Sequence, residues 1–216
     1  MKRTIAIAAL CAGIMLTTFP CQAKESGNLK INAKNFPDTI VREYVSEKID
    51  KNNDGYLSKK EISAVKTIII DKNNLYWENK EKLKEDYEII DCKGLEIFTN
   101  VEKVKLTTYC DTYVSEYGNI KNIEVLTKLT KIKNLEISGV NNSNYDFTKL
   151  NNLERLCIKS TKLKKLNLSK NVKLKNLKLA YNPLLKKINL TKNKNLEKIN
   201  LYGSGVKKIT LGKNNK

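Results

Sequence analysis

Residues 50–61, DKNNDGYLSKKE, place oxygen-bearing side chains at 50, 52, 54, 56, 58 and 61 of a chain whose formal net charge is +18. Calcium takes about six to eight oxygen ligands, and a twelve-residue loop supplies them from positions 1, 3, 5, 7, 9 and 12. Gly55 stands at position 6, where the chain must turn sharply. The expected calcium ligands, with Tyr56 acting through its backbone carbonyl and Ser58 directly or through a water, are Asp50, Asn52, Asp54, Tyr56, Ser58 and Glu61.

The alternative interpretation of this stretch is a polar Asp/Asn turn that binds no metal. Calcium loops of this type usually occur in pairs, and a second one is missing here. Asp71 to Asn74 starts like a second loop, but Leu75 and Trp77 occupy the next odd positions. The missing partner argues against a dockerin, which needs two loops in tandem. We therefore expect a structural calcium site and not a calcium sensor.

The residues on both sides of the loop predict the helices that must position it. Pro37 and Asp38 open the first, on which apolar side chains from Ile40 to Ile49 share one face. The second starts at Ser58-Lys-Lys-Glu61, which has the pattern of a capping box. Helix, loop and helix together predict an EF-hand with loop 50–61, inside a helical cap that spans residues 24–70.

The sequence contains no recognisable catalytic motif. The chain contains no histidine, which excludes Ser-His-Asp and Cys-His catalysis and histidine metal sites. Neither GxxxxGK[ST] nor GxGxxG is present. No base or nucleophile pair can be named, so we do not expect an enzyme.

The amino terminus predicts export. Lys2 and Arg3 precede an apolar run of thirteen residues from Thr4 to Leu16, and a short polar tail ends in Ala23. This is the pattern of a signal peptide spanning residues 1–23, and the run is shorter than the roughly 20 residues that a membrane-spanning helix needs. No later segment is apolar enough to span a membrane, so a secreted or cell-surface location is expected.

Three cysteines remain after the predicted signal peptide: Cys92, Cys110 and Cys157. Because their number is odd and their spacing is wide, free thiols are favoured over one Cys92–Cys110 bridge.

From residue 94 onward an apolar pattern recurs. L-x-x-L-x-L appears from Leu153, Leu163, Leu174, Leu185, Leu196 and Val206, with starts 10 or 11 residues apart and alternate copies 21 or 22 apart. Degenerate copies start at Val101 and Ile132, and some copies end in asparagine, as at Asn182. A unit of this length and pattern is a leucine-rich repeat. Regular Asn, Ser and Gly breaks argue against an amphipathic helix. The predicted fold is an α/β solenoid of about five coils over residues 94–216, joined to the cap by a charged connecting segment, 71–93.

The positive charge is concentrated in the later repeats. Residues 24–150 hold 21 basic and 21 acidic residues, whereas residues 151–216 hold 18 basic residues against Glu154 and Glu197, a net charge of +16. Residues that flank buried strand positions should point outward. The candidate binding face consists of Arg155, Lys159, Lys178, Lys198, Asn200 and Tyr202, and the other half-repeats present Lys165, Lys187 and Lys208. This surface either attracts polyanions or is only a solvated, lysine-rich exterior.

The order of these motifs resembles the exported leucine-rich-repeat proteins of Gram-positive bacteria, broadly the internalins. Asn35-Phe-Pro-Asp38, the loop 50–61, Gly94 to Asn100 and repeats such as Leu168-Ser-Lys-Asn171 follow one another as in that group. The resemblance implies a helical cap leading into the solenoid, a surface-associated binding protein, and the calcium ligands named above. The segment from Tyr76 to Glu88 is an insertion relative to that pattern.

Together these features predict a secreted, calcium-binding leucine-rich-repeat protein that binds a protein or an anionic polymer at the bacterial surface. Nucleic acid is not the expected partner, because arginine is scarce and interleaved aromatic residues are few. The alternative function is an accessory or inhibitor subunit that docks on a secreted enzyme.

Overall fold

The computed structural model describes residues 27–71, 89–108, 119–140 and 143–212. The predicted signal peptide 1–23 and most of the predicted connecting segment 71–93 lie outside these ranges. Among the described residues, no helix is both long enough and apolar enough to cross a membrane.

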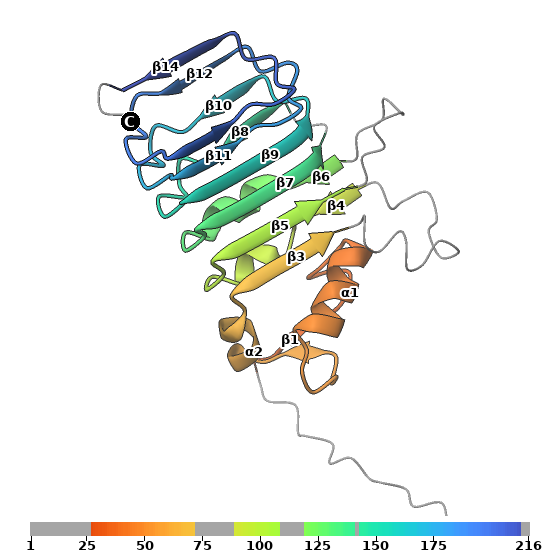
Figure 1. The fold of residues 1–216 in the computed structure, drawn as a ribbon. Helices are drawn as coiled ribbons and strands as arrows, with labels where there is room; N and C mark the ends of the chain where they lie inside the picture. Colours follow the sequence, from red (N-terminus) through yellow and green to blue (C-terminus); the bar gives the residue numbers. More distant parts are fainter. Residues whose placement is uncertain (1–26, 72–88, 109–118, 141–142, 213–216) are drawn as a thin grey trace, which may run out of the picture.

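Six parallel strands form one sheet within the described ranges, in the spatial order β3-β5-β7-β9-β11-β13 (Figure 1). Their bounds are β3 Thr67–Asp71, β5 Lys103–Thr107, β7 Asn134–Val140, β9 Arg155–Thr161, β11 Asn176–Lys178 and β13 Lys198–Asn200. Successive strands of the sheet are neighbours in space and are separated along the chain by one return segment. The chain therefore winds as a solenoid in which each coil adds one strand to the sheet.

The return side of the coils carries shorter elements. Three parallel pairs are formed by β4 Ile89–Asp91 with β6 Asn119–Lys121, β8 Asn144–Asp146 with β10 Lys165–Asn167, and β12 Lys187–Leu190 with β14 Lys208–Leu211. Two 3₁₀ helices, Leu95–Ile97 and Ile123–Lys128, occupy the same side nearer the amino terminus. This arrangement is the predicted leucine-rich-repeat solenoid.

The repeated apolar residues fill the space between the two sides. In the coil that starts at Leu153, the three residues of the motif, Leu153, Leu156 and Ile158, are all fully buried. Because successive side chains of a strand point to opposite faces, the residues between them, Arg155 and Cys157, lie on the outer face of the sheet. Each buried leucine contributes about 1.5–3 kcal/mol to stability, so the core depends on the stacking of neighbouring coils.

Buried asparagines hold the turns between coils. The side-chain amide of Asn193 donates to the carbonyls of Leu168 and Asn171, both at 2.9 Å, and Asn171 does the same one coil earlier. These backbone carbonyls point into the protein, where water cannot satisfy them, so the asparagine amide takes the place of solvent. The fully buried asparagines of the described chain are Asn171, Asn182 and Asn193.

The amino-terminal cap packs on the first strand of the sheet. It consists of α1 Thr39–Lys48, α2 Lys59–Ala64 and an antiparallel pair of β1 Leu29–Lys30 with β2 Tyr56–Leu57. Helix α1 begins at Asp38, whose carboxylate accepts the backbone N–H of Val41 at 2.9 Å and that of Asp91 at 2.9 Å. One carboxylate thus caps the helix and ties it to β4 on the return side.

The hydroxyl of Tyr44 closes the amino-terminal edge of the sheet. It donates to the carbonyl of Thr67 at 3.3 Å and accepts the N–H of Ile69 at 3.2 Å. These are groups of the edge strand β3, which a neighbouring strand would otherwise pair. Burial raises the pKa of Tyr44 more than the hydrogen bond from Ile69 lowers it, so the hydroxyl stays protonated and keeps donating. The cap therefore seals an edge that could pair with another chain.

The sheet begins earlier than the predicted repeat start at residue 94. Strand β3 pairs in register with β5, from Thr67 opposite Lys103 to Asp71 opposite Thr107. Residues 67–70 of this strand fall within the range predicted for the cap, 24–70. The reason is visible in the apolar spacing: Val65, Ile68 and Ile70 are buried and have the same i, i+3, i+5 pattern as the later coils. The first strand of the sheet thus follows directly from helix α2.

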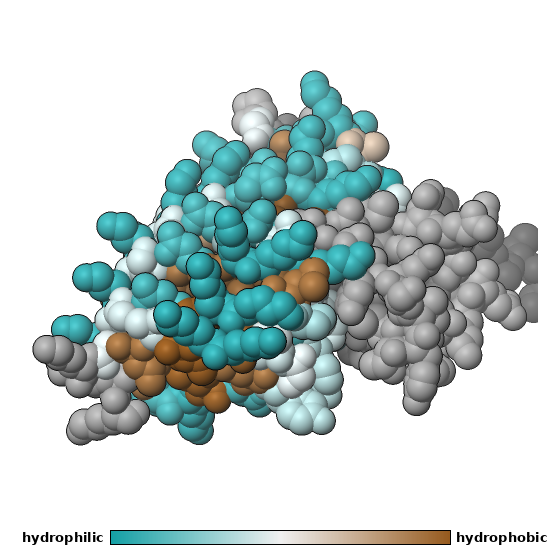
Figure 2. All heavy atoms as spheres, turned by 90° about the horizontal axis from the view of Figure 1, so that it is seen from above, coloured by the Kyte–Doolittle hydropathy of each residue, from teal (hydrophilic) through white to brown (hydrophobic). Residues whose placement is uncertain are grey.

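The opposite end of the solenoid presents apolar surface. The core positions of the last strands are partly exposed, with Ile199 at 40%, Ile209 at 44% and Leu211 at 52% relative accessibility. Figure 2 looks onto the end of the molecule that carries β12–β14 and shows apolar atoms among hydrophilic ones. Among the described residues, the cap covers the amino-terminal edge of the sheet, whereas the last strands keep part of their apolar surface exposed.

Candidate functional site

The predicted calcium loop lies between α1 and α2, as the flanking sequence indicated. Helix α1 ends at Lys48, the loop follows, and α2 starts after Ser58. Gly55 has φ +77°, a conformation that glycine adopts without strain. The short strand β2 leads the chain from this turn to the second helix, pairing with β1 on the way.

Asp50 has the most unusual environment of the predicted ligands. Its side chain is only 3% exposed, although it carries a carboxylate. One oxygen, Oδ2, accepts the N–H of Gly55 at 2.9 Å, whereas the other, Oδ1, is buried without a hydrogen-bond partner. A buried carboxylate oxygen without a partner is costly, because it loses its hydration and gains nothing in return. A cation would satisfy this atom.

Asn52 and Asp54 form a compact turn within the loop. The Asn52 amide donates to Oδ2 of Asp54 at 3.0 Å, and Oδ1 of Asn52 accepts the N–H of Asp54 at 3.3 Å. Oδ1 of Asp54 accepts the N–H of Tyr56 at 2.8 Å. These bonds preorganise the oxygen-rich side of the loop.

Glu61 and Ser58 form the predicted capping box. The Ser58 hydroxyl accepts the N–H of Glu61, and Oε2 of Glu61 accepts both the N–H and the hydroxyl of Ser58, at 2.9 and 2.8 Å. Oε1 of Glu61 accepts the N–H of Lys51 at 2.8 Å, which brings the last ligand position against the start of the loop. Partial burial alone would raise the pKa of Glu61, but these hydrogen bonds outweigh it and lower that pKa.

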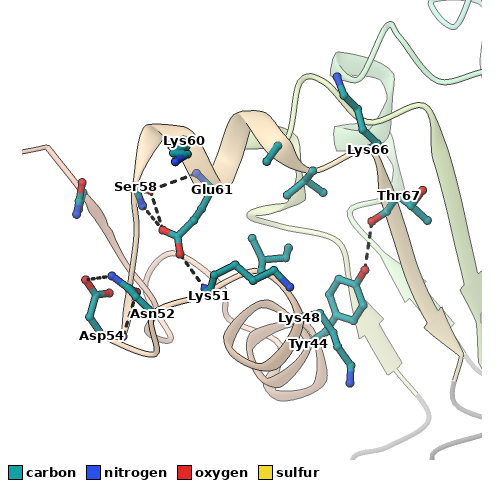
Figure 3. A pocket seen from close by; sticks show the side chains of 14 residues that line it. Tyr44, Lys48, Lys51, Asn52, Asp54, Ser58, Lys60, Glu61, Lys66 and Thr67 are labelled. Carbon is teal, nitrogen blue, oxygen red and sulfur yellow. Dashed lines mark hydrogen bonds between the residues drawn. The ribbon is translucent and has the colours of Figure 1, made fainter. Parts of the chain in front are cut away.

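A hollow of about 1,110 Å³ lies beside the loop, between α1, α2 and the start of β3 (Figure 3). Its lining includes Asn52, Asp54, Ser58 and Glu61, four of the six predicted ligands. Within the described ranges, no three His, Cys, Asp or Glu side chains converge closely enough to hold a metal ion. The predicted ligand set also includes three oxygens that do not belong to carboxylates: those of the Asn52 amide, the Ser58 hydroxyl and the Tyr56 carbonyl. The fit of the loop to calcium therefore rests mainly on Asp50.

The predicted binding face lies on the outer face of the six-stranded sheet. Arg155 and Lys198 share one row, each in register with Asn176 between them. Lys178 and Asn200 share the next row, and Lys159 lies one row further on β9. Tyr202 follows β13 and packs edge-on against Tyr181, with ring centroids 5.3 Å apart. The structure therefore brings five of the six candidates together on three strands, with Tyr202 at their end.

Ion pairs divide these cations into two kinds. Lys159 contacts Glu136 at 2.8 Å, and Lys105 contacts Asp71 at 2.6 Å, so acidic neighbours neutralise both lysines. Arg155, Lys178 and Lys198 form no ion pair with any described residue. Sequence reasoning gave Lys159 the same status as these three, because its contact with Glu136, diagonally across on the neighbouring strand β7, depends on the strand register.

The half-buried thiol of Cys157 lies among these side chains, in register with Lys178. Burial raises its pKa more than the nearby lysines lower it, which favours the protonated thiol. Cys92 is a fully buried free thiol whose pKa burial also raises. The predicted alternative, a Cys92–Cys110 bridge, involves a residue outside the described ranges.

The lysines of the other half-repeats occupy different sheets. Lys165 lies on β10, and Lys187 and Lys208 stand directly opposite each other on β12 and β14. These strands belong to the return side of the coils, so the two predicted sets of cations lie on separate surfaces. Substitutions in one set can therefore be compared with substitutions in the other to locate a binding site.

Sequence reasoning missed two residues of the outer face, Lys103 and Asn134, and left Asn176 out of the candidate binding face. The row that contains Arg155 and Lys198 also includes Lys103, Asn134 and Asn176, which the strand register places side by side. The spacing of 21 and 22 residues between Arg155, Asn176 and Lys198 indicates that these three residues lie side by side. Lys103 was hidden because 31 residues separate it from Asn134, whereas Asn134 precedes Arg155 by 21 residues, the interval of the later repeats.

No protein-family model matches the sequence, and no curated protein matches it. Solved structures do. An internalin (InlF) from Listeria monocytogenes superposes with a TM-score of 0.64 at 21% identity, over 83% of this chain and 47% of its own. The functional domain of InlJ from the same organism, described as including a cysteine ladder, gives 0.60 at 20% identity, over 83% and 34%. The fold is an internalin-like leucine-rich-repeat solenoid. The chain spans half or less of the length of these two structures.

Proposed function

We propose that this chain is a secreted, calcium-binding leucine-rich-repeat protein that works at the bacterial surface as an interaction module for a protein or an anionic polymer. The observation that carries the proposal is the set of cations without acidic partners on the outer face of the sheet: Arg155, Lys178 and Lys198. The internalin-like fold supports binding over catalysis, because a solenoid offers an extended open surface.

The position of these cations favours an anionic partner. They lie within residues 151–216, whose net charge is +16, while residues 24–150 are neutral. A surface of one sign attracts the opposite sign over about a Debye length, near 10 Å at moderate salt. The ion pairs of Lys105 and Lys159 remove charge from the neighbouring part of the sheet. The attraction is therefore strongest toward the carboxy-terminal strands.

Calcium has a structural role in this proposal. Asp50, Asn52, Asp54, Ser58 and Glu61 would hold the ion through side-chain oxygens, and Tyr56 through its carbonyl. When bound, calcium would hold these oxygens together through its positive charge. The support is the buried Oδ1 of Asp50, which has no other partner among the described residues. By fixing the turn between α1 and α2, the loop would stabilise the cap that holds Tyr44 against the edge strand.

The binding proposal is tested by comparing two triple variants. Replacing Arg155, Lys178 and Lys198 by Gln should weaken binding to an anionic polymer such as heparin much more than replacing Lys165, Lys187 and Lys208. Binding of the unchanged protein should also fall steeply with salt, because each neutralised charge releases a counterion. Affinity is measured by calorimetry at several salt concentrations. Equal and small losses from both triples would mean diffuse attraction without a site.

A further inference from the structure

The strand register aligns a row of alternating cations and amides across the outer face of the sheet. From β5 to β13 this row consists of Lys103, Asn134, Arg155, Asn176 and Lys198. The three cations are exposed and the two asparagines are half-buried between them. Cations therefore recur on every second strand. Since neighbouring strands lie about 4.8 Å apart, their spacing along the solenoid axis is about 10 Å.

The row just before the strands carries no net charge. Its members alternate in sign along the solenoid: Lys66, Glu102, Lys133, Glu154, Lys175 and Glu197. Lys133 contacts Glu102 at 2.8 Å, and Lys175 contacts Glu154 at 3.0 Å. This ladder of opposite charges borders one side of the cation–amide row and offers a polyanion no net attraction.

The rows on the other side are neutralised over the first strands. Lys105 is paired with Asp71, and Lys159 with Glu136. Lys103, Arg155 and Lys198 have no acidic partner among the described residues, so unbalanced positive charge lies along the cation–amide row, with unpaired Lys178 beside it on β11. The charge pattern thus has a direction, across the strands and parallel to the solenoid axis.

The face is hollowed under the middle of the row. A depression of about 290 Å³ is lined by side chains of β5, β7 and β9, among them Lys103, Asn134, Glu136, Arg155 and Cys157. The one acidic group in it, Glu136, is held by Lys159 at 2.8 Å. A depression of this size accepts a ring-sized group between Lys103 and Arg155.

We propose that this row binds a linear acidic polysaccharide that carries one anionic group for every two sugar units and lies across the strands. The proposal rests on the proposed polyanion binding and names its ligand class. An extended disaccharide unit is about as long as the spacing of about 10 Å between cations on alternate strands. Successive anionic groups would meet Lys103, Arg155 and Lys198.

The amides between the cations suit a sugar polymer in particular. An asparagine amide has both donors and an acceptor, so Asn134 and Asn176 can bind hydroxyl groups between successive charges. Arg155, at the centre, can form two parallel hydrogen bonds with a carboxylate or a sulfate. An extended acidic peptide could match the charge spacing, but it has no hydroxyl at each intermediate position. The ligand class is therefore set by both the charges and the amides.

The test uses hyaluronan oligosaccharides, which carry one carboxylate per disaccharide, and measures binding to the purified protein by calorimetry. Affinity should rise from disaccharide to hexasaccharide, which supplies three carboxylates, and rise only slightly with further length. Arg155→Gln should weaken hexasaccharide binding about tenfold or more, as expected for a lost hydrogen-bonded charge contact. Asn134→Ala should weaken it less and leave the salt dependence unchanged.

Matched controls separate the site from general attraction. Lys187→Gln removes the same charge from β12 on the return side and should leave hexasaccharide binding unchanged. Oligogalacturonate with three carboxylates on adjacent sugars, and poly-glutamate of equal charge, should bind at least several-fold more weakly. Thermal melting of every variant checks that the fold is retained.

Each contrary result has a distinct meaning. If oligogalacturonate or poly-glutamate binds as tightly and depends equally on Arg155, the face binds polyanions but the disaccharide spacing is overturned. If Lys187→Gln weakens binding as much as Arg155→Gln, the row is not the site. If none of the three polymers binds at low salt, the polymer part of the proposed function fails together with this proposal.

Discussion

Asp50 shows at the residue scale how a buried charge can indicate a missing partner. Its carboxylate is almost fully enclosed, and only one of its oxygens accepts a hydrogen bond, from Gly55. The other oxygen, Oδ1, has none. Folding such a group costs free energy unless something compensates it. The first Asp of a calcium loop is a ligand of the ion, so coordination would explain both why this carboxylate is buried and why Oδ1 lacks a hydrogen bond.

The calcium loop leads to a prediction for Glu61→Gln. Glutamine preserves the capping box but removes the charge of the final ligand, so it separates helix capping from metal binding. Calcium should raise the melting temperature of the unchanged protein, by an amount equivalent to about 1.4 kcal/mol at tenfold over Kd, and should not raise that of the variant. Melting is followed with and without millimolar calcium.

The matched control for this experiment is Glu47→Gln, an exposed glutamate on α1 outside the loop. This variant should respond to calcium as the unchanged protein does. A melting temperature of the unchanged protein that ignores calcium would contradict the structural site. So would an equal response from Glu61→Gln.

The helices on both sides of residues 50–61 were predictable because their signals are local, whereas calcium binding by the loop stays a prediction. Twelve consecutive residues contain both the oxygens and the glycine turn, and the capping box is a four-residue signal that the structure confirms at Ser58 and Glu61. The outer face was less predictable. Whether Lys159 is free or paired depends on Glu136, which is 23 residues away and comes diagonally across from it only through the strand register.

At the scale of elements, the solenoid was predictable from its period, but its first strand was not. Repeats from Leu153 onward recur at constant intervals, and each contributes a strand where the motif places one. Strand β3 has the same apolar spacing at Val65, Ile68 and Ile70, yet it directly follows the calcium loop and helix α2. The stronger helical signal masked it. The interval from β3 to β5 is also longer than the repeat, so the period could not locate β3.

The turns between coils depend on buried asparagines, which gives a prediction for Asn193→Ala. The variant leaves the carbonyls of Leu168 and Asn171 without their donor inside the protein. Two buried acceptors without partners should lower the free energy of unfolding by about 2–4 kcal/mol. Urea unfolding measures the loss. Asn195→Ala, which removes one exposed bond to Val172, should cost less than about 1 kcal/mol. Equal costs for both variants would contradict a special role of the buried amide.

At the scale of the whole molecule, charge is arranged in lines that follow the solenoid axis. The alternating ladder from Lys66 to Glu197 joins successive coils through Lys–Glu contacts, and the cation–amide row beside it is left with unbalanced positive charge. Both lines arise from the same geometry, because parallel strands in constant register stack equivalent positions of every coil. A basic solenoid can thus neutralise one border of its sheet and keep the adjacent row available for a ligand.

The ladder predicts how stability depends on pH. Hydrogen bonds from Lys133 and Lys175, together with their positive charge, lower the pKa of Glu102 and Glu154 below the usual value for glutamate. Groups whose pKa is lowered by folding stabilise the folded state above the pKa of the unfolded chain, near 4.3, and lose that contribution as the pH falls through the lower, folded value. Stability should therefore decrease below about pH 5, and high salt should weaken this dependence.

The double variant Glu102→Gln/Glu154→Gln tests whether the ladder causes part of this loss. It should show a shallower fall in melting temperature between pH 5 and pH 3 than the unchanged protein, because two of the titrating groups are gone. Glu43→Gln/Glu124→Gln, which changes two exposed glutamates outside the ladder that have no ion pair with any described residue, should keep the original slope. Parallel pH profiles for the ladder variant and the unchanged protein would show that the acid sensitivity lies elsewhere, with Glu61, whose pKa hydrogen bonds also lower, as the next group to change.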